Sequence, residues 1–399
     1  MLQRLLSISK IKISFDYFLA FLLICNSLPF FVWGGHLHNY LLYPLLLYYI
    51  ASRVKVKQRF LLSLLFFICI WASSLEENIG SSLSYISVIF LFILKDQCLS
   101  NLYEKIISLL TVLTLVSIVS YIVVRFVGVD LPHYSVPPLQ PSKGYGYLCY
   151  PLFTRPDIPF EFRFYGLFDE AGANGTVSAL ILYIENYDLS KKRNIVFLVN
   201  GLLSVSFFFI LTTLIFYLIN SIETIKRHFM AVILAVSALG AVYFVTKDDE
   251  YFDFYIYQRL SLNDDHQLNG DNRTDASFEI AYNNFLSSSD KWLGRGKGSS
   301  SKVAEDSSSY KMIVYDYGVI WFLLFCIFWI GLILKSSAPL KTKITHLFFI
   351  SALVYQRPIV FTPFYSLLLF MTYTLYINKS NVRSNHTNET TNEFTPAIS

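Results

Sequence analysis

The sequence predicts an all-α polytopic membrane protein with about twelve transmembrane helices and two large loops on the outer side. Composition is the first observation: 54% of the 399 residues are apolar, 17% aromatic and only 15% charged, and the mean hydropathy is +0.48. Globular domains average about one quarter charged residues, so this chain lacks the polar surface of a water-soluble fold. The other observations are a succession of apolar runs of near-membrane length and the basic clusters between them.

The same counts exclude several classes of function. The net charge of +4 is modest and gives no basis for a nucleic-acid partner. No CxxC or Cys/His spacing of a metal site links any of the five cysteines. We therefore expect no metal, no cofactor and no disulfide scaffold.

The basic clusters set the expected order of elements along the chain. The positive-inside rule places all of them on the cytoplasmic side: residues 53–59, 95–105, 191–193, 226–228 and 335–343. The predicted organisation, from the N terminus, is about five spans in 1–129, a first outer loop at 130–173, about four spans in 174–245, a second outer loop at 246–311, about three spans in 312–378, and a disordered cytoplasmic tail at 379–399.

Two apolar runs are each expected to divide into two helices. The run 194–220 is flanked by basic clusters that belong on the same side, so we expect a turn near Ser204–Ser206. The run 344–378 should divide at Arg357-Pro358, because proline cannot continue an ideal helix. A helix is also expected over Ala276–Leu286 in the second loop.

The first outer loop is rich in proline, glycine and tyrosine and is expected to be ordered but irregular. It ends in Arg163-Phe-Tyr-Gly166-Leu-Phe-Asp169-Glu170-Ala-Gly-Ala-Asn-Gly175. This segment places one guanidinium and two carboxylates at the start of a span, where free backbone amides favour an anion. The alternative is that Arg163 pairs with an acidic neighbour as loop scaffolding and that the glycines only form a turn.

The second outer loop offers further cations that suit a phosphate or sugar-phosphate ligand. The run Gly294-Arg295-Gly-Lys297-Gly supplies amide donors and two cations in a flexible turn. Its spacing is wrong for a Walker loop. The alternative is a solvated turn. Three more arginines complete the candidates, two in this loop and one between the last spans: Arg259, Arg273 and Arg357.

These stretches resemble the Wzy-type repeat-unit polymerases of bacterial O-antigen or capsular polysaccharide, in the superfamily shared with the O-antigen ligases. Arg163 to Gly172 is similar to the family's R-x-x-G-x-F-x-(N/E)-P pattern, although Ala171 stands where the pattern often has proline. Arg273, the turn at Gly294–Gly298 and the stretch before Tyr315-Asp-Tyr-Gly318 resemble the family's second motif region. Serines 307–309 occupy the place where the ligase branch often has histidine, which favours polymerase over ligase.

The resemblance implies a multi-pass protein of the bacterial inner membrane that joins undecaprenyl-diphosphate-linked oligosaccharide repeat units, without a metal, at the outer face. It also implies membrane lipid and a chain-length regulator protein as partners. On this basis Arg163, Asp169, Glu170 and Arg273 are the expected catalytic residues. Diphosphate or glycan binding is assigned to Gly166, Arg259, Arg295, Lys297 and Arg357.

Two other functions remain open from the sequence. One is an O-antigen ligase or another polyprenyl-phosphate-dependent glycosyltransferase. The other is a flippase for lipid-linked oligosaccharides. A flippase would place its charges in a central membrane cavity, whereas nearly all ionisable residues of this chain fall in the expected loops, so transport is disfavoured.

Overall fold

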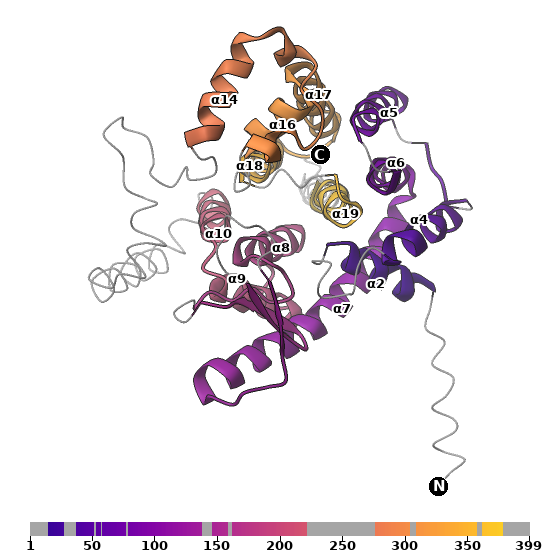
Figure 1. The fold of residues 1–399 in the computed structure, drawn as a ribbon. Helices are drawn as coiled ribbons and strands as arrows, with labels where there is room; N and C mark the ends of the chain where they lie inside the picture. The colour runs from indigo at the N-terminus through magenta and orange to yellow at the C-terminus, as the bar shows by residue number, and fades with distance from the viewer. Residues whose placement is uncertain are drawn as a thin grey trace, which may run out of the picture.

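The computed structural model describes residues 15–27, 37–51, 53–56, 58–76, 79–137, 146–158, 162–221, 276–303, 309–356 and 361–377. Helices account for most of this part of the chain (Figure 1). The N-terminal helices are α2 (Phe15–Ser27), α4 (Leu37–Ile50), α5 (Arg59–Ser74), α6 (Ile79–Ile93) and α7 (Asp96–Ile122). The central helices are α8 (Ala171–Ile184), α9 (Lys192–Leu203) and α10 (Phe207–Ser221). The C-terminal helices are α14 (Ala276–Ser287), α15 (Ser299–Val303), α16 (Tyr310–Tyr317), α17 (Val319–Leu334), α18 (Leu340–Gln356) and α19 (Pro363–Met371).

A small antiparallel sheet lies between α7 and α8 in the sequence. Its strands are β1 (Tyr134–Val136), β2 (Tyr147–Tyr150) and β3 (Phe153–Pro156), paired in the order β1-β2-β3. Aromatic side chains of β2 and β3 pack with Tyr121 of α7. The segment predicted as an irregular loop therefore contains a sheet, whose short strands the proline-rich composition did not indicate.

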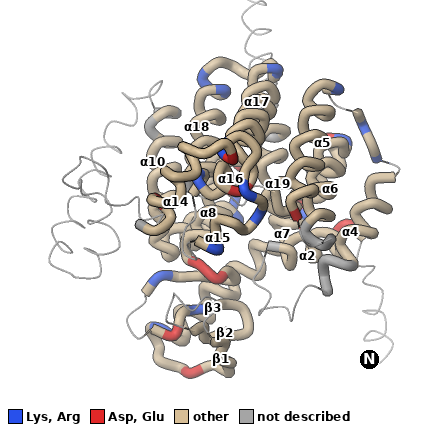
Figure 2. The backbone as a smooth tube through the Cα atoms, turned by 45° about the horizontal axis from the view of Figure 1, so that its top comes forward, with Lys and Arg blue, Asp and Glu red and all other residues tan. Residues whose placement is uncertain are grey.

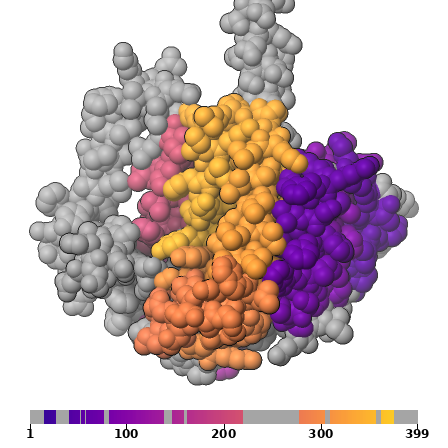
Figure 3. Space-filling model, turned by 90° about the horizontal axis from the view of Figure 1, so that it is seen from above, coloured from indigo at the N-terminus to yellow at the C-terminus, as the bar shows by residue number. Residues whose placement is uncertain are grey.

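One large apolar core joins the N-terminal helices to the C-terminal ones. α19 packs against α6, α7 and α8, and α17 packs against α5. Trp321 of α17 is fully buried, and its indole N–H donates to the carbonyl of Ile68 in α5 at 3.0 Å. In the space-filling view the indigo N-terminal part lies directly against the orange and yellow C-terminal part (Figure 3).

The prediction of about twelve transmembrane helices is wrong for the described part of the chain. Only one helical stretch there is long and apolar enough to cross a bilayer, the 32 residues Asp96–Val127 formed by α7 and a π-helical turn. Its most apolar window is 39% buried within the protein. The other apolar helices have 10–17 residues, and even 17 residues span only about 25 Å against a hydrocarbon thickness of about 30 Å. The same finding contradicts the predicted localisation as a multi-pass protein of the inner membrane.

Backbone breaks explain why the apolar runs give short helices. The run 312–334 is divided at Gly318, whose φ of +91° ends α16 and separates it from α17. The run 194–220 is interrupted at Val205, with φ +46°, between α9 and α10. Beyond α8 the chain turns at Asn186 and Tyr187, both with positive φ. The length of an apolar run therefore overestimates the length of its helix.

Candidate functional site

The Arg163–Glu170 segment is fixed against the turn between α9 and α10. The backbone N–H of Phe164 donates to the carbonyl of Leu203 at 3.0 Å, and the Arg163 Nε donates to the carbonyl of Ser204 at 3.4 Å. Arg163 is half-buried. The guanidinium is thus positioned partly by one backbone carbonyl, a contact that the sequence interpretation did not anticipate.

Gly166 has a structural reason to be glycine. Its φ is +56°, and a Cβ at this position would lie 3.0 Å from the Asn174 side-chain oxygen. Asn174 in turn donates to the carbonyl of Phe164 and exchanges hydrogen bonds with Asn200 of α9. The loop before α8 is therefore tied to α8 and α9 by buried amides, which fixes the residues that follow Gly166.

Asp169 and Glu170 lie at the start of α8, as the sequence predicted, and both are half-buried. Glu170 is the residue before the first helical position, and its carbonyl accepts the N–H groups of Ala173 at 3.1 Å and Asn174 at 3.2 Å. Its side chain makes no capping hydrogen bond to the helix. The Glu170 carboxylate therefore does not cap the first turn of α8.

The Gly294–Gly298 turn is built onto α16 rather than left as a solvated turn. The Asp316 carboxylate accepts the backbone N–H groups of Gly298 at 2.9 Å and Ser300 at 2.8 Å. The N–H of Gly296 donates to the Asp316 carbonyl at 3.0 Å. Burial raises the pKa of Asp316, and the two amide hydrogen bonds oppose that rise. Within the second motif region, the structure therefore brings the Gly294–Gly298 turn against the Tyr315–Gly318 stretch.

Both cations of this turn have protein partners. The Arg295 guanidinium donates to the Tyr315 hydroxyl at 2.6 Å and to Asp290 at 3.3 Å. Lys297 forms an ion pair with Glu76, which follows α5. Figure 2 shows acidic and basic segments gathered around α16, between α14 and α6. The turn thus joins the C-terminal helices to the α5–α6 connection.

Sequence reasoning missed the cluster that receives Lys297. The Glu76 side chain is only 5% exposed. Tyr85 of α6 donates to Glu76 Oε1 at 2.9 Å, and the hydroxyls of Tyr85 and Tyr317 lie 2.6 Å apart. Burial, first of all, raises the pKa of both tyrosines, so they stay neutral donors. The sequence did place an acidic residue, Glu76, between two apolar runs, but such a residue is equally typical of a polar turn.

An apolar cavity of about 270 Å³ lies between α17 and α18. Tyr310 of α16 lines it together with Phe322, Trp329, Ile350 and Tyr355. Tyr310 and Tyr355 stack, with ring centroids 6.0 Å apart. The cavity suits an apolar ligand with few polar groups.

Three predicted site residues, Arg259, Arg273 and Arg357, lie outside the described residues, as do 222–275 and the tail at 378–399. Where the structure describes the chain, no three His, Cys, Asp or Glu side chains are grouped so that they could hold a metal ion.

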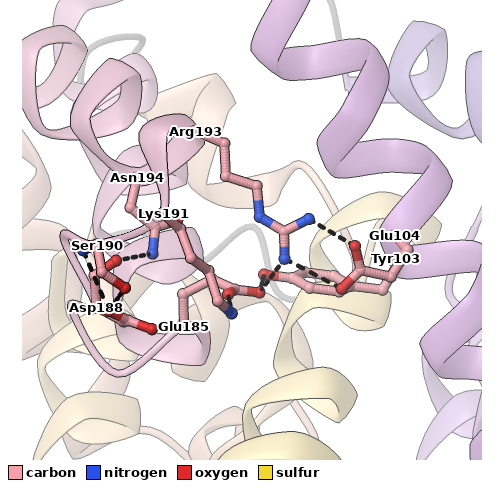
Figure 4. Close-up of polar contacts among 8 residues, drawn as sticks. All are labelled: Tyr103, Glu104, Glu185, Asp188, Ser190, Lys191, Arg193 and Asn194. Atoms are coloured by element: carbon pink, nitrogen blue, oxygen red, sulfur yellow. Dashed lines mark hydrogen bonds and ion pairs between the residues drawn. The ribbon is translucent and has the colours of Figure 1, made fainter.

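A separate ion-pair network joins α7, α8 and α9 (Figure 4). Glu185, whose side chain is 1% exposed, pairs with Lys191 and, at 3.0 Å, with Arg193. Arg193 also grips Glu104 of α7 with two bonds, at 2.5 and 3.1 Å. Burial alone would raise the pKa of Glu185, but the two cations outweigh it and hold the pKa below its ordinary value. The network holds the three helices together.

Comparison with known proteins adds no relative: no family model, curated protein or solved structure matches this chain.

Proposed function

We propose that the chain is a glycosyltransferase that joins oligosaccharide repeat units carried on a polyprenyl diphosphate, as the resemblance to the Wzy-type polymerases implies. The observation that carries the proposal is the anchored Gly294–Gly298 turn. Asp316 holds its backbone, so Arg295 and Lys297 project from one fixed loop, and Lys297 pairs with a buried carboxylate, Glu76. Cations for a departing diphosphate and a carboxylate for an acceptor hydroxyl are the groups that this transfer needs.

The roles follow from charge. In the transfer, the acceptor oxygen bonds to the sugar's anomeric carbon, the bond from that carbon to the diphosphate oxygen breaks, and the diphosphate keeps the electron pair. Arg295 and Lys297 neutralise that charge, with Arg163 as a further cation. Asp169 or Glu170 orients the acceptor hydroxyl or accepts its proton.

The apolar cavity between α17 and α18 supports a lipid-linked substrate. It is bordered by Tyr310, the first residue of α16, the same helix whose last turn carries Asp316. An apolar chain in the cavity and a diphosphate at the turn would therefore use two ends of one short helix. The twelve-span membrane arrangement forms no part of this proposal.

The test is the glycan profile of a strain that lacks the chain, restored with variants at matched abundance. A polymerase deletion leaves glycan one repeat long on its final acceptor, whereas a ligase deletion strands polymer on the polyprenyl diphosphate and a flippase deletion traps units inside the cell. We expect the first profile from the deletion and from Arg163→Ala and Arg295→Ala. Full-length polymer from both variants would exclude a role for Arg163 and Arg295 in the transfer. A deletion profile typical of a ligase or a flippase would exclude polymerase as the function of this chain.

A further inference from the structure

The two side chains of the Lys297–Glu76 ion pair differ in their exposure to solvent. Lys297 is 39% exposed, while the Glu76 side chain is 5% exposed. Tyr85 and Tyr317, which extend the cluster inward, are 4% and 8% exposed. The ammonium therefore lies on the solvent side of the carboxylate, and a ligand from solvent meets Lys297 first.

The Lys297 side chain is partly exposed, and the space beside the glycines on either side of it is open. A Cβ on Gly298 would meet nothing within 4 Å, and one on Gly296 would meet only the Ser299 hydroxyl at 3.9 Å. The backbone itself is held, because Gly296 and Gly298 both donate to Asp316. A change of partner by Lys297 is thus a side-chain movement on a fixed loop.

Removing Lys297 would leave Glu76 with the Tyr85 hydroxyl as a donor. A buried carboxylate without its cation is costly, because burial disfavours a charge that has no partner. The same cost keeps Lys297 in place until an anion of higher charge competes for the ammonium.

We propose that Lys297 exchanges Glu76 for a phosphate of the donor substrate, and that the uncovered Glu76 is the base that takes the proton of the acceptor hydroxyl. This inference rests on the proposed glycosyl transfer and assigns its proton. The hydroxyl proton moves to Glu76, and the diphosphate leaves with the electron pair against Lys297. Asp169 and Glu170 then orient the acceptor. The ligand of Lys297 is a diphosphate, and binding it is coupled to releasing the base.

If Lys297 exchanges partners in this way, one variant, Glu76→Gln, should bind pyrophosphate more tightly and yet transfer glycan more slowly. In Glu76→Gln, Lys297 loses its competing carboxylate, so the variant should bind inorganic pyrophosphate about three- to tenfold more tightly by titration calorimetry. The same variant should transfer glycan about 100-fold more slowly or worse, since the base is gone. Lys297→Met should lose most of the pyrophosphate affinity. A residue that only supports the fold would not tighten binding while slowing the reaction.

Controls and a second variant keep the test decisive. Glu279→Gln removes the carboxylate of another lysine pair, with Lys311 at 2.6 Å, and should alter neither quantity. Tyr85→Phe keeps the ion pair but removes a hydrogen-bond donor to Glu76. It should slow glycan transfer and change the pyrophosphate affinity less than about twofold. This variant replaces Glu76→Gln in the test if Glu76→Gln does not fold. Unchanged or weaker pyrophosphate binding by a folded Glu76→Gln, or full transfer by it, would overturn the inference. Failure of the unsubstituted protein to transfer glycan would instead overturn the proposed function.

Discussion

Asp316 accepts the backbone N–H of Ser300 at 2.8 Å and so ties the loop that carries both candidate cations to the last turn of α16. The second carboxylate oxygen accepts the N–H of Gly298. One buried side chain therefore organises a loop that the sequence alone could only describe as flexible.

Asp316→Asn should destabilise the protein by about 1–3 kcal/mol, since the amide offers one acceptor oxygen and places a second donor against a backbone N–H. Urea unfolding at neutral pH measures the loss. Asp290→Asn is the matched control, because the Asp290 side chain is 51% exposed and its bond to Arg295 is weak; it should cost less than about 1 kcal/mol. Equal losses in the two variants would contradict the anchoring role.

Two glycines of the same turn separate backbone strain from close packing. Gly294 and Gly298 have similar φ values, +83° and +77°. A Cβ on Gly294 would run into the backbone of Asp316 and Tyr317, whereas one on Gly298 would meet nothing within 4 Å. Gly298→Ala should therefore cost about 1–2 kcal/mol, the strain of a left-handed conformation. Gly294→Ala should cost about 1–3 kcal/mol more in the same unfolding assay, because backbone must shift. If the two alanine variants were equally stable, the close approach would not matter.

Several helix boundaries were predictable from the sequence. The turn near Ser204–Ser206 is present, and a helix covers Ala276–Ser287, where the residue pattern predicted one. Basic clusters on the same side of a membrane predicted that turn, so a correct break followed from a topology that the structure contradicts. Side-chain chemistry near a turn is local information, whereas helix length depends on positive-φ residues such as Val205 that no hydropathy sum reports.

The site was predictable in its motifs but not in its partners. The glycine-rich turn and the Tyr315–Gly318 stretch were identified, and they meet at Asp316. Glu76 was not identified, because its role depends on a contact between the α5–α6 connection and a loop far along the chain. Composition, likewise, gives the amount of apolar surface but not how it is distributed. Helix α7, for instance, buries Leu110 and exposes Val112.

The Glu185 network should contribute stability that depends on pH. The pKa of the Glu185 carboxyl is held below its ordinary value of 4.5. The stability that the network contributes is therefore complete above pH 4.5 and is lost as the pH falls through the lowered pKa of the folded state. Glu185→Gln should cost about 3 kcal/mol at neutral pH, since it leaves two cations facing a neutral group. Glu104→Gln, at a side chain that is 50% exposed, should cost less than about 1 kcal/mol. A gap between Glu185→Gln and the unsubstituted protein that did not narrow below pH 4.5 would refute the assignment.

His346 should make the protein less stable in mild acid. It is fully buried in α18 between the Tyr183 hydroxyl, 3.2 Å from Nδ1, and Thr372, 3.4 Å from Nε2. Burial lowers its pKa from 6.5 to about 3. The unfolded chain therefore binds a proton below pH 6.5 that the folded protein refuses, and stability present above pH 6.5 falls as the pH drops toward 3.

The size of the His346 effect follows from proton linkage. Between about pH 8 and about pH 5 the unsubstituted protein should lose about 2 kcal/mol more than His346→Gln, which retains polar groups but does not titrate. Urea unfolding at several pH values measures both proteins over a range in which most carboxylates stay ionised. The difference between the two curves isolates His346 from the other titrating groups. Parallel curves over this range would show that the folded imidazole titrates near its ordinary pKa of 6.5, which would contradict a buried ring that stays neutral.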